Sequence, residues 1–122
     1  MTVFYDVFNG DADGICALHQ LRLADPRAAE LVTGVKRDIA LLERVGAQAG
    51  DEVTVLDISL ARNAVALQKL LARGARLRYF DHHYAGAISA HPHLETYIDT
   101  AADVCTSLLV DRYLNGSARI WA

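Results

Sequence analysis

The apolar and polar positions along the chain alternate between two patterns. Short runs rich in β-branched and aromatic residues, typical of buried strands, occupy residues 2–8, 30–35, 52–58, 75–80 and 95–98. Apolar residues at helical spacing occupy residues 15–24, 39–45, 60–73 and 104–114. This alternation predicts an α/β domain, with a mostly parallel sheet of about five strands and helices on both faces.

Local signals mark the ends of the expected helices. The helix that begins at Ile15 stops at Asp25, because the residue before a proline avoids helical backbone angles. Ser59 is a candidate cap for the third helix, and Gly74 closes it. The elements therefore follow one another closely, with no linker between them.

Composition narrows the class of protein. The chain has 122 residues, 52% of them hydrophobic and 22% charged, which is enough for one domain with a core. A net charge of -3 creates no overall field that attracts nucleic acid or an anionic membrane. A polyanionic partner therefore needs a few local basic side chains or a metal ion.

Several features favour a cytoplasmic protein with no membrane partner. The first residues do not have the pattern of a signal peptide, and no apolar run reaches the length that spans a membrane. Cys16 and Cys105 lie far apart and form no CxxC motif, so we expect buried, reduced thiols. A disulfide between them is the alternative.

Polar and charged residues follow every expected strand at the same end. In strand order they are Asn9, Asp11 and Asp13; Lys36 and Arg37; Asp57; Asp81, His82 and His83; and Asp99. The carboxyl ends of parallel strands lie on one edge of a sheet, and ligands bind there. We therefore expect these side chains to share one rim.

Clustered carboxylates need a counter-charge or raised pKa values, and a divalent cation supplies the counter-charge. Asp11 and Asp13 reach one small volume if their loop curls, which the flanking glycines permit. Asp57 arrives on a separate strand, and His82 adds an imidazole nitrogen. Oxygen-rich ligands with one histidine suit Mn²⁺ or Mg²⁺ better than a thiolate-bound zinc.

Each motif taken alone has a simpler interpretation. The stretch NGDADG is typical of a turn in which Asp13 caps the following helix. The histidine pair is typical of a polar loop, and Asp99 is typical of the start of a turn. Their coincidence at the carboxyl ends of successive strands favours a shared site.

Three motifs in order resemble the DHH phosphoesterase superfamily: DADG after the first strand, LDIS on the third, and DHH after RLRYF. Its members include RecJ-type exonucleases, short-oligonucleotide phosphatases, cyclic-dinucleotide phosphodiesterases and family II pyrophosphatases. The resemblance runs from about Val3 to Leu114. It implies a hydrolase that cleaves a phosphodiester or phosphoanhydride bond in a nucleotide or short single-stranded oligonucleotide, with two Mn²⁺ ions or with Mg²⁺.

The resemblance also implies a role for each motif residue. Asp11 and Asp13 correspond to ligands of different metal ions. Asp57 corresponds to the bridging ligand, and His82 to a further ligand. His83 is the catalytic candidate, as a contact to the scissile phosphate or as an acid. The alternative for His83 is a bond to a backbone carbonyl that only shapes the loop.

Three other residues correspond to weak ligands or to groups behind the ligands: Asn9, Asp81 and Asp99. Asp81 is expected to orient a histidine, as carboxylates next to metal sites do. Asn9 occupies a position at which some members carry another acid. Asp99 is a candidate for the fourth metal-binding acid, although it comes earlier in the chain than that motif does.

Candidate phosphate-binding groups come from two places. Thr106 and Ser107 lie in DTAADVCTS, which resembles the superfamily's stretch of small and hydroxyl residues at a helix start, where backbone N–H groups meet an anion. Lys36 and Arg37 supply positive charge after the second strand. The alternative for this basic pair is that both side chains are solvated.

Two departures from the superfamily pattern affect the expected domain organisation. In the superfamily, the fourth acidic motif follows a further strand. The final residues of this sequence, ARIWA, resemble the start of that strand, and the motif itself is missing. The usual C-terminal substrate-binding domain, DHHA1, is absent. Residues 1–122 are therefore expected to form a DHH domain that is incomplete at its C-terminus and that is not necessarily active alone.

Two rival functions stay open on sequence grounds. A receiver-like regulatory domain also has acids after its first strand, and Asp57 could be its phosphoacceptor. No lysine ends the fifth strand, however, and the histidine pair has no role in such a domain. The other rival is a metal-binding remnant without catalysis, which the missing fourth motif permits.

Overall fold

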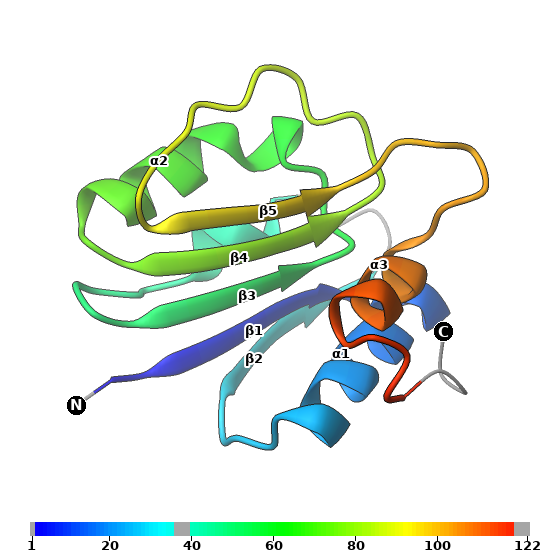
Figure 1. The fold of residues 1–122 in the computed structure, drawn as a ribbon. Coiled ribbons are helices and arrows are strands. Elements are labelled where there is room, and N and C mark those ends of the chain that lie inside the picture. The colour runs from blue at the N-terminus through cyan, green and yellow to red at the C-terminus, as the bar shows by residue number, and fades with distance from the viewer. Residues whose placement is uncertain (1, 36–39, 119–122) are drawn as a thin grey trace.

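The computed structural model describes residues 2–35 and 40–118. Within them, five strands form one sheet in the order β2-β1-β3-β4-β5, and every neighbouring pair is parallel (Figure 1). The strands are β1 (Phe4–Asn9), β2 (Glu30–Gly34), β3 (Glu52–Leu56), β4 (Arg76–Asp81) and β5 (Leu94–Ile98). The predicted α/β fold with a parallel sheet is thus confirmed.

Helices cover both faces of the sheet, as the sequence predicts. Figure 1 shows α1 (Ala12–Ala24) and α3 (Thr106–Tyr113) together on one face, with α2 (Ala64–Ala72) on the other. One short 3₁₀ turn at Leu41–Arg44 precedes β3, and a second at Ala61–Asn63 directly precedes α2. The first of these replaces the helix expected at residues 39–45, whose first residue lies outside the described part.

The two faces form two apolar cores, because neighbouring residues of a strand point to opposite sides of the sheet. On β3, Val53 and Val55 pack into the core beneath α2, whereas Leu56 packs into the core beneath α1 and α3. On β4, Tyr79 and Phe80 divide in the same way. Burial on both faces explains the adjacent apolar residues Val55 and Leu56 on β3 and Tyr79 and Phe80 on β4.

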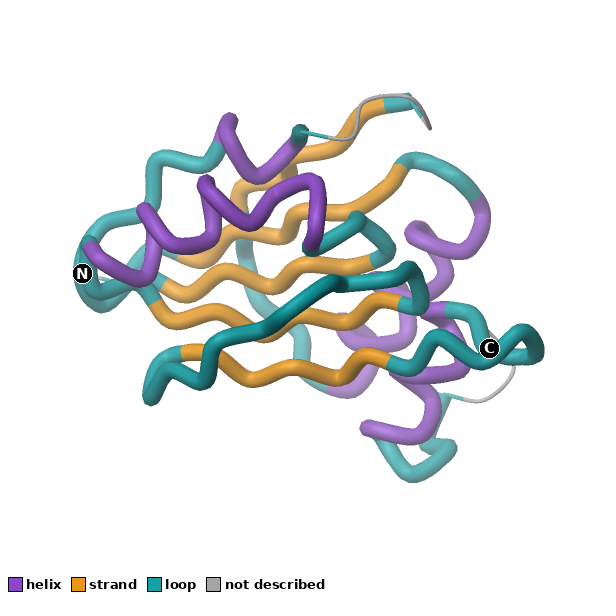
Figure 2. Tube along the Cα trace, turned by 90° about the horizontal axis from the view of Figure 1, so that it is seen from above, coloured by secondary structure: helices purple, strands orange, loops and turns teal. Residues whose placement is uncertain are grey.

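The connection between β4 and β5 contains no helix. Residues 82–93 leave the carboxyl end of β4 and run back along the α2 side of the sheet to β5 (Figure 2). The loop begins with the histidine pair and therefore carries both rings at the edge of the sheet.

Among the residues that the structure describes, no helix has the length and apolar character needed to span a membrane.

The cysteines differ in part from expectation. Cys16 and Cys105 are free thiols in the described structure, as predicted, but each is only partly buried. Cys16 lies in α1, and Cys105 directly precedes α3. Both thiols therefore belong to the helical layer that α1 and α3 form.

The strand order reverses between β1 and β3, because the chain passes from β1 outward to β2 and then returns to the other side of β1. In parallel sheets a crevice opens at such a reversal, outside the carboxyl ends of the strands. Asp11 and Asp13 follow β1, Asp57 follows β3, and Asp81 ends β4, the next strand. The fold therefore brings the motif residues to one crevice.

Candidate metal centre

The chain turns sharply from β1 into α1. Two glycines at this turn lie so close to neighbouring backbone that there is no room for a side chain on either. A Cβ on Gly14 would lie 2.1 Å from the backbone oxygen of Asn9, and one on Gly10 would lie 2.6 Å from that of Gly34. Asp11 caps α1, since its Oδ1 accepts a hydrogen bond of 2.9 Å from the backbone N of Gly14. The cap is thus Asp11, not the Asp13 of the simpler interpretation, and α1 starts at Ala12.

Asp13 instead lies in the first turn of α1 and contacts the start of α3. Its Oδ1 accepts a hydrogen bond of 2.8 Å from the backbone N of Ser107, and its Oδ2 accepts one of 3.1 Å from that of Thr106. Burial alone would raise the pKa of this carboxyl, but the backbone donors outweigh burial and lower the pKa. Asp13 is therefore ionised at neutral pH.

Asp57 directly follows β3 in an unusual backbone conformation, with φ at 64°. Aspartate tolerates this left-handed region better than most residues do, although at some cost. Asp57 is only 2% exposed, and its Oδ1 accepts a hydrogen bond of 3.0 Å from the hydroxyl of Thr106.

Burial, together with the negative charges of Asp13 and Asp11, raises the pKa of Asp57 to about 8. The hydrogen bond from Thr106 acts in the opposite direction. Asp11, Asp13 and Asp57 thus share one neighbourhood, as predicted from the sequence. A cation among them would relieve the repulsion that raises the pKa of Asp57.

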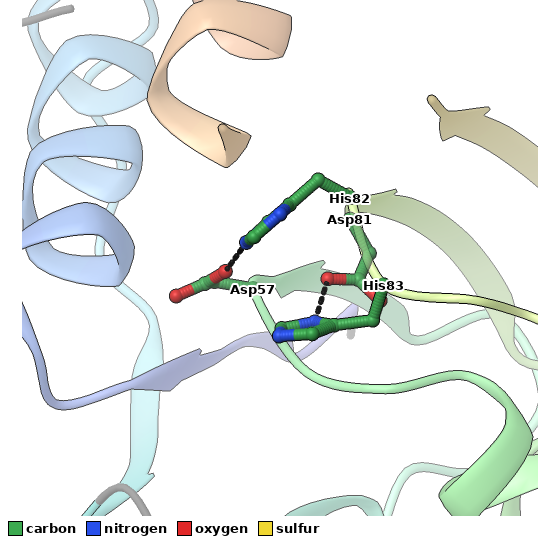
Figure 3. A group of neighbouring side chains, drawn as sticks. All are labelled: Asp57, Asp81, His82 and His83. Atoms are coloured by element: carbon green, nitrogen blue, oxygen red, sulfur yellow. Dashed lines mark hydrogen bonds and ion pairs between the residues drawn. The ribbon is translucent and has the colours of Figure 1, made fainter. Parts of the chain in front are cut away.

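His82 points from the end of β4 into this cluster (Figure 3). Its Nε2 lies 3.1 Å from Oδ1 of Asp57 and 3.5 Å from Oδ2 of Asp13. The imidazole therefore joins carboxylates from the segments after two different strands. These are three of the four side chains expected to bind metal.

His83 turns into the same region, because β4 ends at Asp81 and the chain bends there. Its Nδ1 lies 2.6 Å from Oδ1 of Asp81, and the two histidine rings are 4.4 Å apart between centroids. Asp81 has no solvent exposure, and its burial raises its pKa. Asp81 thus contacts a histidine, the contact expected of it.

Figure 3 shows Asp57, Asp81, His82 and His83 together, and one potential ligand atom from each lies within 4.8 Å of the others. The Oδ2 atom of Asp81 is buried and has no hydrogen-bond partner among the described residues. Buried polar atoms are rarely left unpaired. Of these four side chains, Asp57 and His82 are predicted as ligands from the sequence, and Asp81 and His83 lie directly beside them.

The other predicted residues lie in different positions. Asn9 is partly buried, and its Oδ1 likewise lacks a partner among the described residues. Asp99 begins a turn: its Oδ1 accepts from the backbone N of Ala101, and its Oδ2 lies 3.4 Å from Arg112. This is the simpler alternative for Asp99. Lys36 and Arg37 lie outside the described residues.

The sequence did not indicate the role of the start of α3. Thr106 and Ser107 were expected to meet a substrate anion, but their backbone N–H groups meet the carboxylate of Asp13. These partners are 93 and 94 positions apart in the chain, so no local pattern could indicate the contact. The one available signal was the run of small and hydroxyl residues before the helix.

The fold is similar to that of solved proteins, although no family model and no curated protein matches the sequence. The structure resembles exonuclease RecJ bound to manganese, with a TM-score of 0.51 and 19% sequence identity over 91% of this chain and 33% of that chain. It also resembles RecJ from Thermus thermophilus in complex with Mn²⁺, with a TM-score of 0.51 and 19% identity over 92% of this chain and 18% of that chain.

These matches define a class of fold. RecJ-type exonucleases are members of the superfamily that the three motifs resemble, so the predicted resemblance is confirmed for the fold. The chain spans a third or less of the two solved proteins.

Proposed function

We propose that this chain is the metal-binding catalytic domain of a phosphoesterase that hydrolyses a phosphodiester or phosphoanhydride bond in a nucleotide or short oligonucleotide. One observation carries the proposal: Nε2 of His82 lies within 3.5 Å of both Asp13 and the buried Asp57. These three side chains follow the ends of three separate strands. A local turn or a helix cap would not need side chains from three strands to meet.

The metal proposed is Mn²⁺, as two ions, with Mg²⁺ as the alternative. The donors are three carboxylates and an imidazole, a set that suits these cations. The RecJ structures that share the fold hold manganese, which supports this choice. A pair of divalent ions supplies a water activated at neutral pH and a counter-charge for the phosphate.

The protein residues then divide the remaining work. Asp11 and Asp13 would each hold an ion. Asp57 would hold both, because it lies near enough to Asp11 and Asp13 for their negative charges to raise its pKa. His82 completes the donor set. Asp81 fixes the ring of His83 through Nδ1, and in the imidazolium form Nε2 of His83 also carries a proton, which it can donate to a phosphate oxygen.

Burial of Asp57 disfavours the receiver-like alternative. A phosphoacceptor must be reached by a phosphodonor, whereas Asp57 is 2% exposed and its Oδ1 is shared by His82 and Thr106. The non-catalytic alternative predicts metal binding without turnover. A cytoplasmic location stays a prediction.

The test measures manganese content and hydrolysis of bis(p-nitrophenyl) phosphate and of a short oligonucleotide, for the wild-type chain and for Asp57→Asn. We expect two Mn²⁺ per chain and metal-dependent turnover in the wild type, and neither in the variant. Asp25→Asn is the matched control, because it removes an exposed acid at the C-terminal end of α1, away from the cluster. Manganese binding without turnover would favour the non-catalytic alternative, and no binding would refute the metal centre.

A further inference from the structure

Thr106 contacts both central carboxylates through two different groups. Its hydroxyl donates to Oδ1 of Asp57 over 3.0 Å, and its backbone N donates to Oδ2 of Asp13 over 3.1 Å. The residue has no solvent exposure. One buried residue thus joins the segment after β1 to the segment after β3.

The direction of the Thr106 hydroxyl is not what the helix itself requires. A threonine in a helix usually bonds the carbonyl three or four residues before it, and one next to the cap satisfies its own helix end. Here the hydroxyl bonds a carboxylate 49 positions away in the chain. The N-cap position, Cys105, makes no side-chain capping bond, and the Thr106 hydroxyl bonds a group outside the helix.

The start of α3 is held in place by its neighbours. The backbone N of Ser107 donates to the other oxygen of Asp13, and Nε2 of the fully buried Gln20 donates to the carbonyl of Ser107 over 2.9 Å. Val110 of α3 packs in the core with Leu21 of α1. Because α1 and α3 are fixed to each other, Thr106 holds a defined position relative to both carboxylates.

We propose that Thr106 is a positioning residue that fixes the separation of Asp13 and Asp57, and with it the geometry in which they share metal ions. The inference rests on the proposed function, in which both aspartates are ligands. Thr106 thus acts through the two carboxylates, a different role from binding the substrate phosphate.

Thr106→Val tests this role, because valine has nearly the shape of threonine, keeps the backbone N–H and replaces the hydroxyl by a methyl group. Manganese alone is the probe, titrated calorimetrically into the 122-residue chain, with electron paramagnetic resonance to detect spin coupling between paired ions. We expect affinity to fall on the order of 10–100-fold, the usual effect of losing a partner behind a metal ligand, and the coupled signal to weaken. Thr106→Ser, which retains the hydroxyl, restores both.

Thr54→Val is the matched control, since it removes another buried threonine hydroxyl, on β3, whose partner is Arg78. If Thr106→Val does not fold, Thr106→Ala removes the same hydroxyl without introducing a γ-methyl group. Manganese affinity within about twofold of wild type in the hydroxyl-free variant, against the expected loss for a partner behind a ligand, refutes the positioning role and leaves the proposed function intact. A wild-type chain that binds no manganese refutes both.

Discussion

Nδ1 of His83 lies 2.6 Å from Oδ1 of Asp81, a carboxylate with no solvent exposure. The His83 side chain itself is 45% exposed. A buried carboxylate thus fixes one side of a ring that is otherwise open to solvent at the rim of the site. This arrangement sets the tautomer and the orientation of a histidine, as in pairs that serve proton transfer.

The first prediction concerns His83→Ala. In the proposed role, the ring contacts the phosphate and does not hold the metal. Turnover should therefore fall by a factor on the order of 10²–10⁴, the usual loss for a positioned proton-transfer group, while manganese content stays at the wild-type value. Steady-state kinetics and metal analysis on the same preparation measure both.

His91→Ala is the control for this prediction, because His91 lies at the far end of the same loop and contacts His93. Unchanged turnover in His83→Ala would leave His83 with a role in shaping the loop. Lost manganese would mean that His83, and not His82, is the ligand.

The second prediction concerns Asp57→Asn in the absence of metal. Burial and the neighbouring carboxylates raise the pKa of Asp57 to about 8, so at about pH 6 the metal-free protein holds a protonated carboxyl there. An amide has the same shape and no charge. The variant should therefore unfold at a temperature equal to or above that of the metal-free wild type, while manganese no longer raises its melting temperature. A large loss of stability without metal would mean that Asp57 is ionised there.

Much of the fold could be predicted from the sequence, because short segments rich in β-branched and aromatic residues alternate with apolar residues at helical spacing. The alignment of Asp11, Asp57 and His82 was predictable for a related reason, since parallel strands end at one edge. The sequence favours Asp13 as the cap because the apolar pattern predicts a helix from Ile15. The helix instead starts at Ala12, and Asp11 caps it through the backbone N of Gly14.

Contacts between segments that are distant in the chain could not be predicted, because no local sequence pattern indicates them. Asp13 meets the backbone of α3 only after α1 and α3 pack on the same face of the sheet. The same packing turns the Thr106 hydroxyl toward Asp57. Such a contact depends on tertiary packing that residue types at fixed spacing do not encode.

The third prediction is the pH dependence of stability without metal. The carboxyl of Asp57 has a pKa of about 8 when folded and an ordinary value of 3.8 when unfolded. Between these values the unfolded chain has released a proton that the folded chain keeps. Rising pH therefore favours unfolding, and stability should fall from about pH 4 to about pH 8. Asp81, whose pKa burial also raises, acts in the same direction.

Asp13 acts in the opposite sense, because its lowered pKa stabilises the fold above its ordinary value of 3.8. Its effect is lost only as the pH falls below that value, outside the window of Asp57. Urea unfolding from about pH 4 to about pH 8 measures the slope, and Asp57→Asn should flatten it. Manganese should stabilise the wild type more as the pH rises, since ligand carboxylates must be deprotonated. A slope that Asp57→Asn leaves unchanged would contradict the assignment.

The fourth prediction concerns Gly14, in the first turn of α1, which packs against the backbone of Asn9. In Gly14→Ala the new Cβ would lie 2.1 Å from the backbone oxygen of Asn9, a contact that only a backbone shift relieves. Such overpacking costs about 1–3 kcal/mol of unfolding free energy, and the shift moves Asp11 and Asp13 with it. Gly46→Ala is the matched control, because nothing lies within 4 Å of its added Cβ. Urea unfolding should show a loss for Gly14→Ala only, with weakened manganese binding. Equal stability of the two variants would mean that this turn accommodates a side chain and that Gly14 does not fix the carboxylates.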